Sequence, residues 1–409
     1  MKRFLYSSLM FFMILVIIGC NSTSTQNETT QIFLGGYHSS VITQDGKVYT
    51  WGRNMYGGLG DSTRVSKSIP IDITSELNLK SSETIIQMSL GIYHSSVITS
   101  KGRLLTWGNN GYGQIGDNTT INRLTPVDVT SHFNLNGDEK IIQVSFNGVS
   151  SSAITSEGRI FTWGSNSSTP INVLTPMDIT SEFNLNAGET IIQASLGGLF
   201  YSSAITSEGR IFTWGNNQNG QLGDGTTTER LTPVDITSEL NLNAEEMIIE
   251  TFLGSSHSLA ITLEGRIFTW GSNSSGQLGD GATTDRLTPV DITSKFNLNA
   301  GEMIIQASLG GYHSSAITSE GRIFTWGHNF GGKLGDGTTT NRLTPVDITS
   351  EFNLNVEETI IQVSLGGYHS SAITSEGRIF TWGENEYGQL GDGTTTSNST
   401  PVNITSKFN

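Results

Sequence analysis

Histidine is the residue type in this chain that most directly suggests chemistry, because it recurs at one place in a repeated string. Five copies of the string carry it, namely His38, His94, His257, His313 and His369. Two further copies carry Ser150 and Tyr201 instead. Zinc needs nitrogen ligands at about 2.0–2.1 Å, and equivalent positions on a ring of seven repeats cannot converge that closely. The sequence therefore predicts hydrogen-bonded core histidines and no metal site.

Acidic residues beside glycine form a second recurring feature, in loops of the Leu-Gly-Asp-Gly type. The aspartates are Asp61, Asp117, Asp224, Asp280, Asp336 and Asp392. Calcium takes 6–8 oxygen ligands, and each loop offers a single carboxylate. An asparagine also follows every Trp-Gly pair, at Asn54, Asn110, Asn166, Asn217, Asn273, Asn329 and Asn385. Both residue types are typical of turns, so we expect them to stabilise the loops.

No catalytic constellation is present in the sequence. It lacks a glycine-rich phosphate loop with lysine, a His-Glu metal motif and a serine in a nucleophile elbow. His328, Glu384 and Arg53 occupy equivalent positions on consecutive repeats. General acid–base catalysis needs hydrogen-bond contact, and the edges of adjacent repeats are too far apart to expect it. We therefore predict a protein that is not an enzyme and uses no cofactor.

Composition excludes several other classes of protein. The 409 residues include 48 glycines and one cysteine, so a disulfide scaffold and a cysteine-based zinc module are excluded. The formal net charge is -15. Binding of nucleic acid needs clustered basic residues, so nucleic acid is not an expected partner.

The elements that position these residues come from a repeat read seven times. All seven tryptophans stand in the tripeptide Thr-Trp-Gly, at Trp51, Trp107, Trp163, Trp214, Trp270, Trp326 and Trp382. Their spacings are 56, 56, 51, 56, 56 and 56 residues. A period of this length with several short strands per unit predicts an all-β, seven-bladed propeller over residues 31–409.

The last unit shows how four antiparallel strands arise in each blade. Apolar and polar residues alternate in 360–367, and further strands are expected at 370–374, 378–383 and 401–405. Trp382 should lie between neighbouring sheets. Between blades, the stretch Thr-Ser-Glu-Phe-Asn-Leu-Asn-Ala-Gly-Glu and its variants could form one helical turn, and we expect it to be a charged, solvated loop. How the ring closes between its first and last strands is open at this point.

The motifs resemble those of a known family. Gly-Gly-Tyr-His-Ser-Ser-Ala-Ile-Thr, Glu-Gly-Arg-Ile-Phe-Thr-Trp-Gly and the following Asn-x-x-Gly-Gln-Leu-Gly-Asp-Gly resemble the regulator of chromosome condensation repeat, over residues 31–409. The resemblance implies a seven-bladed propeller used mainly as a protein-binding platform. It also implies that some relatives are guanine-nucleotide exchange factors, although no blade shows an extra hairpin with which to open a nucleotide site.

Departures from the repeat are the candidates for function. Blades one, two, six and seven vary after Trp-Gly and carry Arg53, Met55, Tyr56, Tyr112, His328, Phe330, Glu384, Glu386 and Tyr387. Blades three to five carry Ser, Asn and Gln there. Because blade seven meets blade one, the first group should form one arc, and aromatic residues with arginine are typical of binding hot spots. Drift in unconstrained loops is the alternative explanation.

Blades three and four suggest a second candidate site. Blade three lacks its Leu-Gly-Asp-Gly loop, and blade four has one additional residue in 199–201. These changes could open a notch on the opposite side of the ring, or they could be tolerated changes in surface loops.

The first residues indicate export. Lys2 and Arg3 precede an apolar run from Phe4 to Ile18, which is short for a membrane span and is typical of a secretory signal. Ile17-Ile18-Gly19-Cys20 resembles the bacterial lipoprotein box. We expect a signal peptide at 1–19, a lipid on Cys20 and a flexible polar tether at 20–30, with an uncleaved anchor as the alternative.

These expectations combine into one functional hypothesis. The chain is expected to be a monomer held by lipid on the extracytoplasmic face of the cell membrane, where it binds an unknown protein or glycan. A role as an exchange factor for a small GTPase is the alternative, and it requires a location inside the cell.

Overall fold

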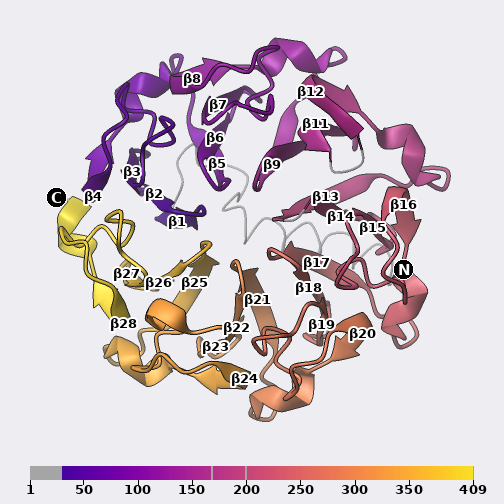
Figure 1. Ribbon diagram of the computed structural model, residues 1–409, viewed down its shortest axis with the longest axis vertical. Helices are drawn as coiled ribbons and strands as arrows, with labels where there is room; N and C mark the ends of the chain where they lie inside the picture. The colour runs from indigo at the N-terminus through magenta and orange to yellow at the C-terminus, as the bar shows by residue number, and fades with distance from the viewer. Residues whose placement is uncertain (1–29, 167–168, 199, 409) are drawn as a thin grey trace.

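The computed structural model describes residues 30–166, 169–198 and 200–408, which form a closed ring of seven blades (Figure 1). Each blade is a four-stranded sheet whose strands follow one another in chain order from the central channel to the rim. Neighbouring strands pair antiparallel throughout, as in His369↔Gly383 and Phe380↔Asn403 of blade seven. The predicted seven-bladed all-β propeller is confirmed.

The strands occupy four concentric positions. The innermost strands are β1 (Gln31–Leu34), β5 (Ile85–Leu90), β9 (Ile141–Phe146), β13 (Ile191–Gly197), β17 (Ile248–Leu253), β21 (Ile304–Leu309) and β25 (Ile360–Leu365). The second strands are β2 (His38–Ile42), β6 (His94–Thr99), β10 (Ser150–Thr155), β14 (Tyr201–Thr206), β18 (His257–Thr262), β22 (His313–Thr318) and β26 (His369–Thr374). The third strands are β3 (Val48–Gly52), β7 (Leu104–Gly108), β11 (Ile160–Asn166), β15 (Ile211–Gly215), β19 (Ile267–Gly271), β23 (Ile323–Gly327) and β27 (Ile379–Gly383). The outermost strands are β4 (Lys67–Asp72), β8 (Arg123–Asp128), β12 (Thr169–Asp178), β16 (Arg230–Asp235), β20 (Arg286–Asp291), β24 (Arg342–Asp347) and β28 (Asn398–Asn403).

Short 3-10 helices connect the blades. They are η1 (Thr74–Leu77), η2 (Thr130–Phe133), η3 (Thr180–Phe183), η4 (Thr237–Leu240), η5 (Thr293–Phe296), η7 (Thr349–Phe352) and η8 (Thr405–Phe408), with η6 (Phe330–Gly332) inside a rim loop. In the described segments none of these helices is long and apolar enough to cross a membrane. The outer strand of blade seven ends at Asn403 rather than at Thr405, because the Asn403 side chain accepts hydrogen bonds from the N–H and hydroxyl of Thr405.

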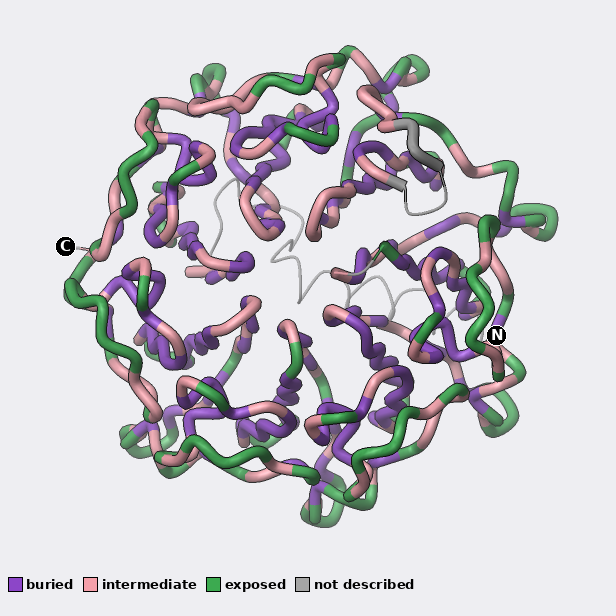
Figure 2. Tube along the Cα trace, viewed as in Figure 1, coloured by how far each residue is buried: buried purple, intermediate pink, exposed green. Residues whose placement is uncertain are grey.

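Tryptophan packs between the blades as predicted. Six indoles are at most 2% exposed, and each donates its Nε1–H over 2.9 Å to a backbone carbonyl in the rim loop of the preceding blade. The pairs are Trp51 with Gln389, Trp107 with Gly58, Trp163 with Gln114, Trp270 with Gln221, Trp326 with Gln277 and Trp382 with Lys333. Figure 2 shows the resulting pattern, with buried residues on the strands and exposed residues along the rim and turns.

Side chains and the last short helix close the ring, without exchange of strands between the ends of the chain. Blade one consists of β1 to β4 and blade seven of β25 to β28, and β1 and β25 lie side by side (Figure 1). The N–H of Ile32 donates to Gln362 Oε1 over 3.1 Å, and the N–H of Leu34 donates to Ser364 Oγ over 3.2 Å. Phe408 of η8 packs edge-on against Trp51 of blade one, with ring centroids 5.7 Å apart.

Candidate functional site

Two turns of every blade meet on one face of the ring. The residue after each Trp-Gly pair donates its backbone N–H to the carbonyl of the residue before the second strand. In this way Arg53 bonds Tyr37 over 2.9 Å, and Glu384 bonds Tyr368 over 3.1 Å. The variable rim loops therefore lie directly over the inner turns. The described part of the chain begins at the opposite face, where Thr30 lines a depression with the β2–β3 turn, Gly377 and η8.

Four tyrosines occupy this inner turn in the consecutive blades six, seven, one and two, and those of blades seven, one and two stack on one another. We call this set, Tyr312, Tyr368, Tyr37 and Tyr93, the tyrosine row. Tyr37 is central: its ring stacks on Tyr368 with centroids 5.1 Å apart and on Tyr93 with centroids 5.5 Å apart. Burial raises the pKa of Tyr37 above its ordinary value, so its hydroxyl stays protonated. Blades three to five replace the tyrosine by Val149, Phe200 and Ser256, so the row stops there.

Arg53 lies over this row. Its guanidinium carbon is 4.3 Å from the ring centroid of Tyr387, 5.1 Å from that of Tyr37 and 5.2 Å from that of Tyr93. Its Nη1 donates to the Tyr93 hydroxyl over 3.3 Å. Such cation–π contacts contribute roughly 0.5–2 kcal/mol each, depending on burial. The three rings therefore hold the guanidinium in one orientation on the face of the propeller.

Lys333 supplies a second cation, and it is buried. It stands where most other blades have glutamine, and its side chain is 0% exposed. Its Nζ lies 3.9 Å from Glu384 Oε1 and 4.9 Å from the ring centroid of Tyr368, with no hydrogen-bond partner among the described residues. Burial lowers the pKa of Lys333 to about 8 and raises the pKa of Glu384. The pair links blade six to blade seven beneath the tyrosine row.

The structure brings most of the predicted arc together. Met55 Sδ accepts a hydrogen bond from Arg53 Nη2 over 3.2 Å, and Tyr56 packs edge-on against Tyr93. His328 lies between Phe330 and Tyr312, with ring centroids at 6.4 and 6.3 Å. Phe330, Tyr112 and Met55 are 68%, 48% and 46% exposed, and Glu386 is also exposed. Tyr112 and Glu386 lie on the same face, but no ring contact or ion pair of the described chain joins them to the tyrosine row.

Sequence reasoning missed the tyrosine row and Lys333. In the sequence the tyrosines resemble ordinary residues of the repeat, although their replacement in blades three to five follows the same boundary as the predicted arc. Lys333 replaces the glutamine that four other units carry at this position, and that departure was the available signal.

The groups considered for catalysis and metal binding have structural partners. No hydrogen bond or ion pair within the described segments joins His328, Glu384 and Arg53 to one another. The recurring histidines are at most 1% exposed, and each contacts a serine of the next blade, as in His38 Nε2 to Ser95 Oγ at 2.8 Å. Burial lowers the pKa of His38 to about 4, so the imidazole is neutral near pH 7. Where the structure describes the chain, no group of three or more His, Cys, Asp or Glu is placed to hold a metal.

The loop asparagines and aspartates stabilise turns, as expected. Asn110 Nδ2 donates to Asp117 Oδ1 over 3.0 Å, and Asn110 Oδ1 accepts the N–H of Ile115 over 2.9 Å. Asp117 Oδ2 also accepts from Arg123 Nε over 2.6 Å. The same contacts recur in most other blades, for example between Asn329, Asp336 and Arg342. Blade three has no such loop, so Asn166 instead ends β11 and pairs with Thr169 of β12.

The acidic stretch between blades begins with a single 3-10 turn and continues as a largely exposed loop, but the expectation of a solvated loop is wrong for its final glutamate. This residue is buried in six copies, at Glu83, Glu139, Glu189, Glu246, Glu302 and Glu358. The guanidinium of Arg322, 2.6 Å from Glu302, lowers the pKa of that carboxyl to about 2. These carboxylates fix the blade-to-blade connections and do not form a free acidic rim.

Blade three differs from the others in a way that the sequence did not predict. β11 and β12 extend to pair Gly164 with Val173 and Asn166 with Thr169, where other blades have the Leu-Gly-Asp-Gly loop. Blade three still has four strands, so this extension adds no hairpin to the blade. Trp214 of blade four is half-buried, unlike the other six tryptophans. Leu199, part of the irregular turn of blade four, lies outside the described residues, and the notch stays a prediction.

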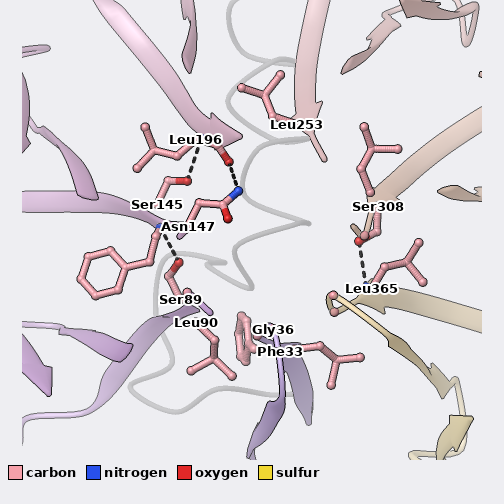
Figure 3. A pocket seen from close by; sticks show the side chains of 18 of the residues that line it. Phe33, Gly36, Ser89, Leu90, Ser145, Asn147, Leu196, Leu253, Ser308 and Leu365 are labelled. Atoms are coloured by element: carbon pink, nitrogen blue, oxygen red, sulfur yellow. Dashed lines mark hydrogen bonds between the residues drawn. The ribbon is translucent and has the colours of Figure 1, made fainter. Parts of the chain in front are cut away.

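A channel of about 560 Å³ runs along the innermost strands (Figure 3). Side chains on these strands bond the backbone of the next blade, as in the N–H of Phe146 to Ser89 Oγ at 3.0 Å and the N–H of Leu365 to Ser308 Oγ at 3.0 Å. Blade five breaks this pattern with Glu250 and Phe252. Burial raises the pKa of Glu250 to about 8, and its buried Oε2 has no partner in the described chain.

Comparison with known proteins places these repeats in a family. The model of the RCC1-like domain matches residues 17–349, and models of the regulator of chromosome condensation (RCC1) repeat match residues 376–409 and 360–389. The chain belongs to the RCC1 repeat family. It is 27% identical to the ultraviolet-B receptor UVR8 of Arabidopsis thaliana over 381 residues, which are 93% of this chain and 82% of the receptor.

Solved structures share the RCC1 propeller fold. Human WBSCR16 superposes with a TM-score of 0.75 at 21% identity, covering 88% of this chain and 94% of that one. Yeast RCC1 (Prp20), solved with Kap60, superposes with a TM-score of 0.74 at 20% identity, covering 93% and 84%. RCC1-like propellers are mostly interaction modules or exchange factors, and their shared scaffold does not determine a partner.

Proposed function

We propose that this RCC1 propeller is a non-enzymatic protein-binding module that uses the arc of blades six, seven, one and two. The observation that carries the proposal is the tyrosine row with Arg53 above it, present on this side of the ring and replaced by other residue types in blades three to five. Large aromatic residues and arginine contribute most binding energy at protein interfaces. The exposed Phe330 and Tyr112 extend this surface along the rim.

We further propose that the module is exported and held at the membrane through a lipid on Cys20. The support is the Ile17-Ile18-Gly19-Cys20 string after a short apolar run, which lies outside the described residues. Chain entry at the face opposite the tyrosine row is compatible with this attachment, since the binding face would then be directed away from the membrane.

Site-specific cross-linking tests the binding face. A photoreactive residue at Phe330 of the full-length protein in intact cells should give a discrete cross-linked partner, whereas the same residue at Leu231, 69% exposed in blade four, should not. Replacing Tyr56 and Tyr387 by serine should abolish the cross-link while the melting temperature stays within a few degrees. An unchanged cross-link in that folded variant would contradict the proposal.

Protease treatment of intact cells tests the location. We expect added protease to degrade the propeller of the wild-type protein. A variant that combines Cys20→Ser with removal of the leader should stay inside the cell and be protected. Full protection of the wild-type protein, together with accelerated nucleotide release from a GTPase, would favour the exchange-factor alternative.

A further inference from the structure

Among the described residues, two arginines lack the carboxylate partner that the other arginines there have. Ten of the twelve arginines in the described chain form an ion pair with a carboxylate, among them Arg103 with Glu83 at 2.8 Å and Arg230 with Asp224 at 2.6 Å. Arg53 and Arg64 pair with no carboxylate in the part of the chain that is described. The chain carries 37 acidic against 22 basic residues, so unpaired guanidinium groups are unexpected in its surface.

Both unpaired arginines belong to one loop, between β3 and β4 of blade one. Arg53 Nη2 bonds Met55 Sδ over 3.2 Å, and Arg64 Nη1 bonds the Met55 carbonyl over 3.5 Å. The two guanidinium groups therefore flank Met55. The carboxylate of this loop, Asp61, is already engaged: it accepts from Asn54 and Thr63 and lies 3.9 Å from Lys67.

We infer that the β3–β4 loop of blade one is a docking site for an acidic segment of the partner protein. This inference deepens the proposed protein-binding function and rests on it. Arg53 and Arg64 bind the carboxylates of this segment, and the exposed Met55 and Val65, 46% and 62% exposed, contact an apolar residue beside them. Arginine binds carboxylates through two parallel hydrogen bonds. Because three rings already hold Arg53, little side-chain entropy is lost when a carboxylate binds.

The surrounding charges define the class of anion. Glu384 and the exposed Glu386 lie on the same face in blade seven, next to Tyr387, which contacts Arg53. A polyanion such as polyphosphate, nucleic acid or an anionic membrane would spread over these carboxylates and be repelled. A short peptide segment with one or two acidic side chains fits between them, so an acidic peptide is the occupant that the charges favour.

A defined peptide tests this inference. Fluorescence anisotropy of the full-length protein with a labelled peptide of alternating leucine and glutamate should show binding that weakens as salt is added. The matching leucine–glutamine peptide and the leucine–lysine peptide should bind at least about tenfold more weakly. Glu386→Gln should tighten binding of the acidic peptide, because it removes a neighbouring negative charge.

Two double variants with the same change in charge separate the site from overall electrostatics. R53Q with R64Q should weaken binding of the acidic peptide about tenfold or more, whereas K101Q with K295Q, both exposed lysines, should change it less than twofold. R64Q alone leaves the rings around Arg53 intact and should weaken binding about threefold. Equal binding by the two double variants, or tighter binding of anionic vesicles than of the peptide, would overturn the inference.

The outcome is distinguishable from failure of the proposed function. If the Phe330 cross-link depends on Tyr56 and Tyr387 but survives R53Q with R64Q, the arc binds a protein through other contacts and only the acidic docking site is wrong. If the cross-link does not depend on the two tyrosines while binding of the acidic peptide still depends on both arginines, the proposed binding arc is wrong. The carboxylate-binding site in blade one is then supported independently of it.

Discussion

Replacement of Glu250 by glutamine should stabilise the ring, because it restores a contact that other blades make. At the equivalent position Gln193 accepts the N–H of Thr251 at Oε1 over 2.9 Å and donates from Nε2 to the carbonyl of the same residue over 3.3 Å. Gln362 makes both contacts to Ile32 across the closure of the ring. A carboxylate has no N–H to donate, and Oε2 of Glu250 is buried without a partner in the described chain.

The expected magnitude follows from the pKa of this carboxyl. Burial raises it from an ordinary value of 4.5 to about 8, so the folded state binds the proton more tightly than the unfolded state does. The free energy of unfolding therefore falls as pH rises from about 4.5 to about 8. At pH 7 the loss amounts to at most roughly 3 kcal/mol. Glu250 as a residue is only partly buried, so we expect about 1–3 kcal/mol. The gain in the glutamine variant should nearly vanish below pH 4.5.

Calorimetry of the full-length protein at pH 5 and pH 8 checks this. A gain of about 1–3 kcal/mol corresponds to an increase in Tm of roughly 1–4 °C for a propeller of this size. Gln306→Glu is the matched reverse change, in the next blade, where the N–H of Val363 now donates to the glutamine over 3.2 Å. It should lower the Tm more at pH 8 than at pH 5. A Tm of Glu250→Gln that exceeds wild type equally at both pH values, or not at all, would refute the reasoning.

Three further changes test the ring. Trp382→Ala should cost about 3–5 kcal/mol by calorimetry, since the indole is fully buried, whereas Trp214→Ala should cost less because that indole is half-buried. Burial lowers the pKa of the Lys333 amine to about 8, so Lys333→Gln should raise the Tm below pH 8. The gain should shrink as the pH approaches 10. An unchanged Tm at every pH would contradict the burial argument. Phe408→Ala should weaken the closure between blades seven and one, detected as faster proteolysis near β28 than in a Val356→Ala control, Val356 being 92% exposed.

The scaffold could be predicted from the sequence because its residues recur with their partners. The sequence separation between a residue and its contact is nearly the same in each unit for the Trp-Gly pairs, the Asn–Asp loops and the histidines. The contacts of one blade therefore predict those of the others. The burial of Glu302 was not predicted, although its partner Arg322 lies twenty positions further along the chain and the same spacing recurs at Glu83–Arg103 and Glu358–Arg378. Opposite charges at that distance do not by themselves indicate a contact, and only the fold shows that the two side chains meet.

The candidate site could be predicted only in part, because its contacts cross between repeats. The variable residues after Trp-Gly were found by comparing units, yet Tyr37 appeared to be one more repeat residue. Its role depends on Tyr368, which is 331 positions away in the sequence and 5.1 Å away in the ring. Comparison within one unit cannot show a contact made where the first and last blades meet.

The position of the site at the closure of the ring links stability to binding. Blades seven and one are joined by side-chain contacts on the innermost strands, by Phe408 at the rim and by the stacking of Tyr37 on Tyr368 at the binding face. Arg53 of blade one also contacts Tyr387 of blade seven, with its guanidinium carbon 4.3 Å from the ring centroid, so a partner that holds Arg53 in place strengthens a contact across the same seam. Because such a ligand binds the closed ring better than an opened one, it should stabilise the propeller by mass action. Protection of the β28 segment from proteolysis by the acidic peptide, in wild type and not in R53Q with R64Q, is therefore the expected consequence of binding at this place rather than elsewhere on the ring.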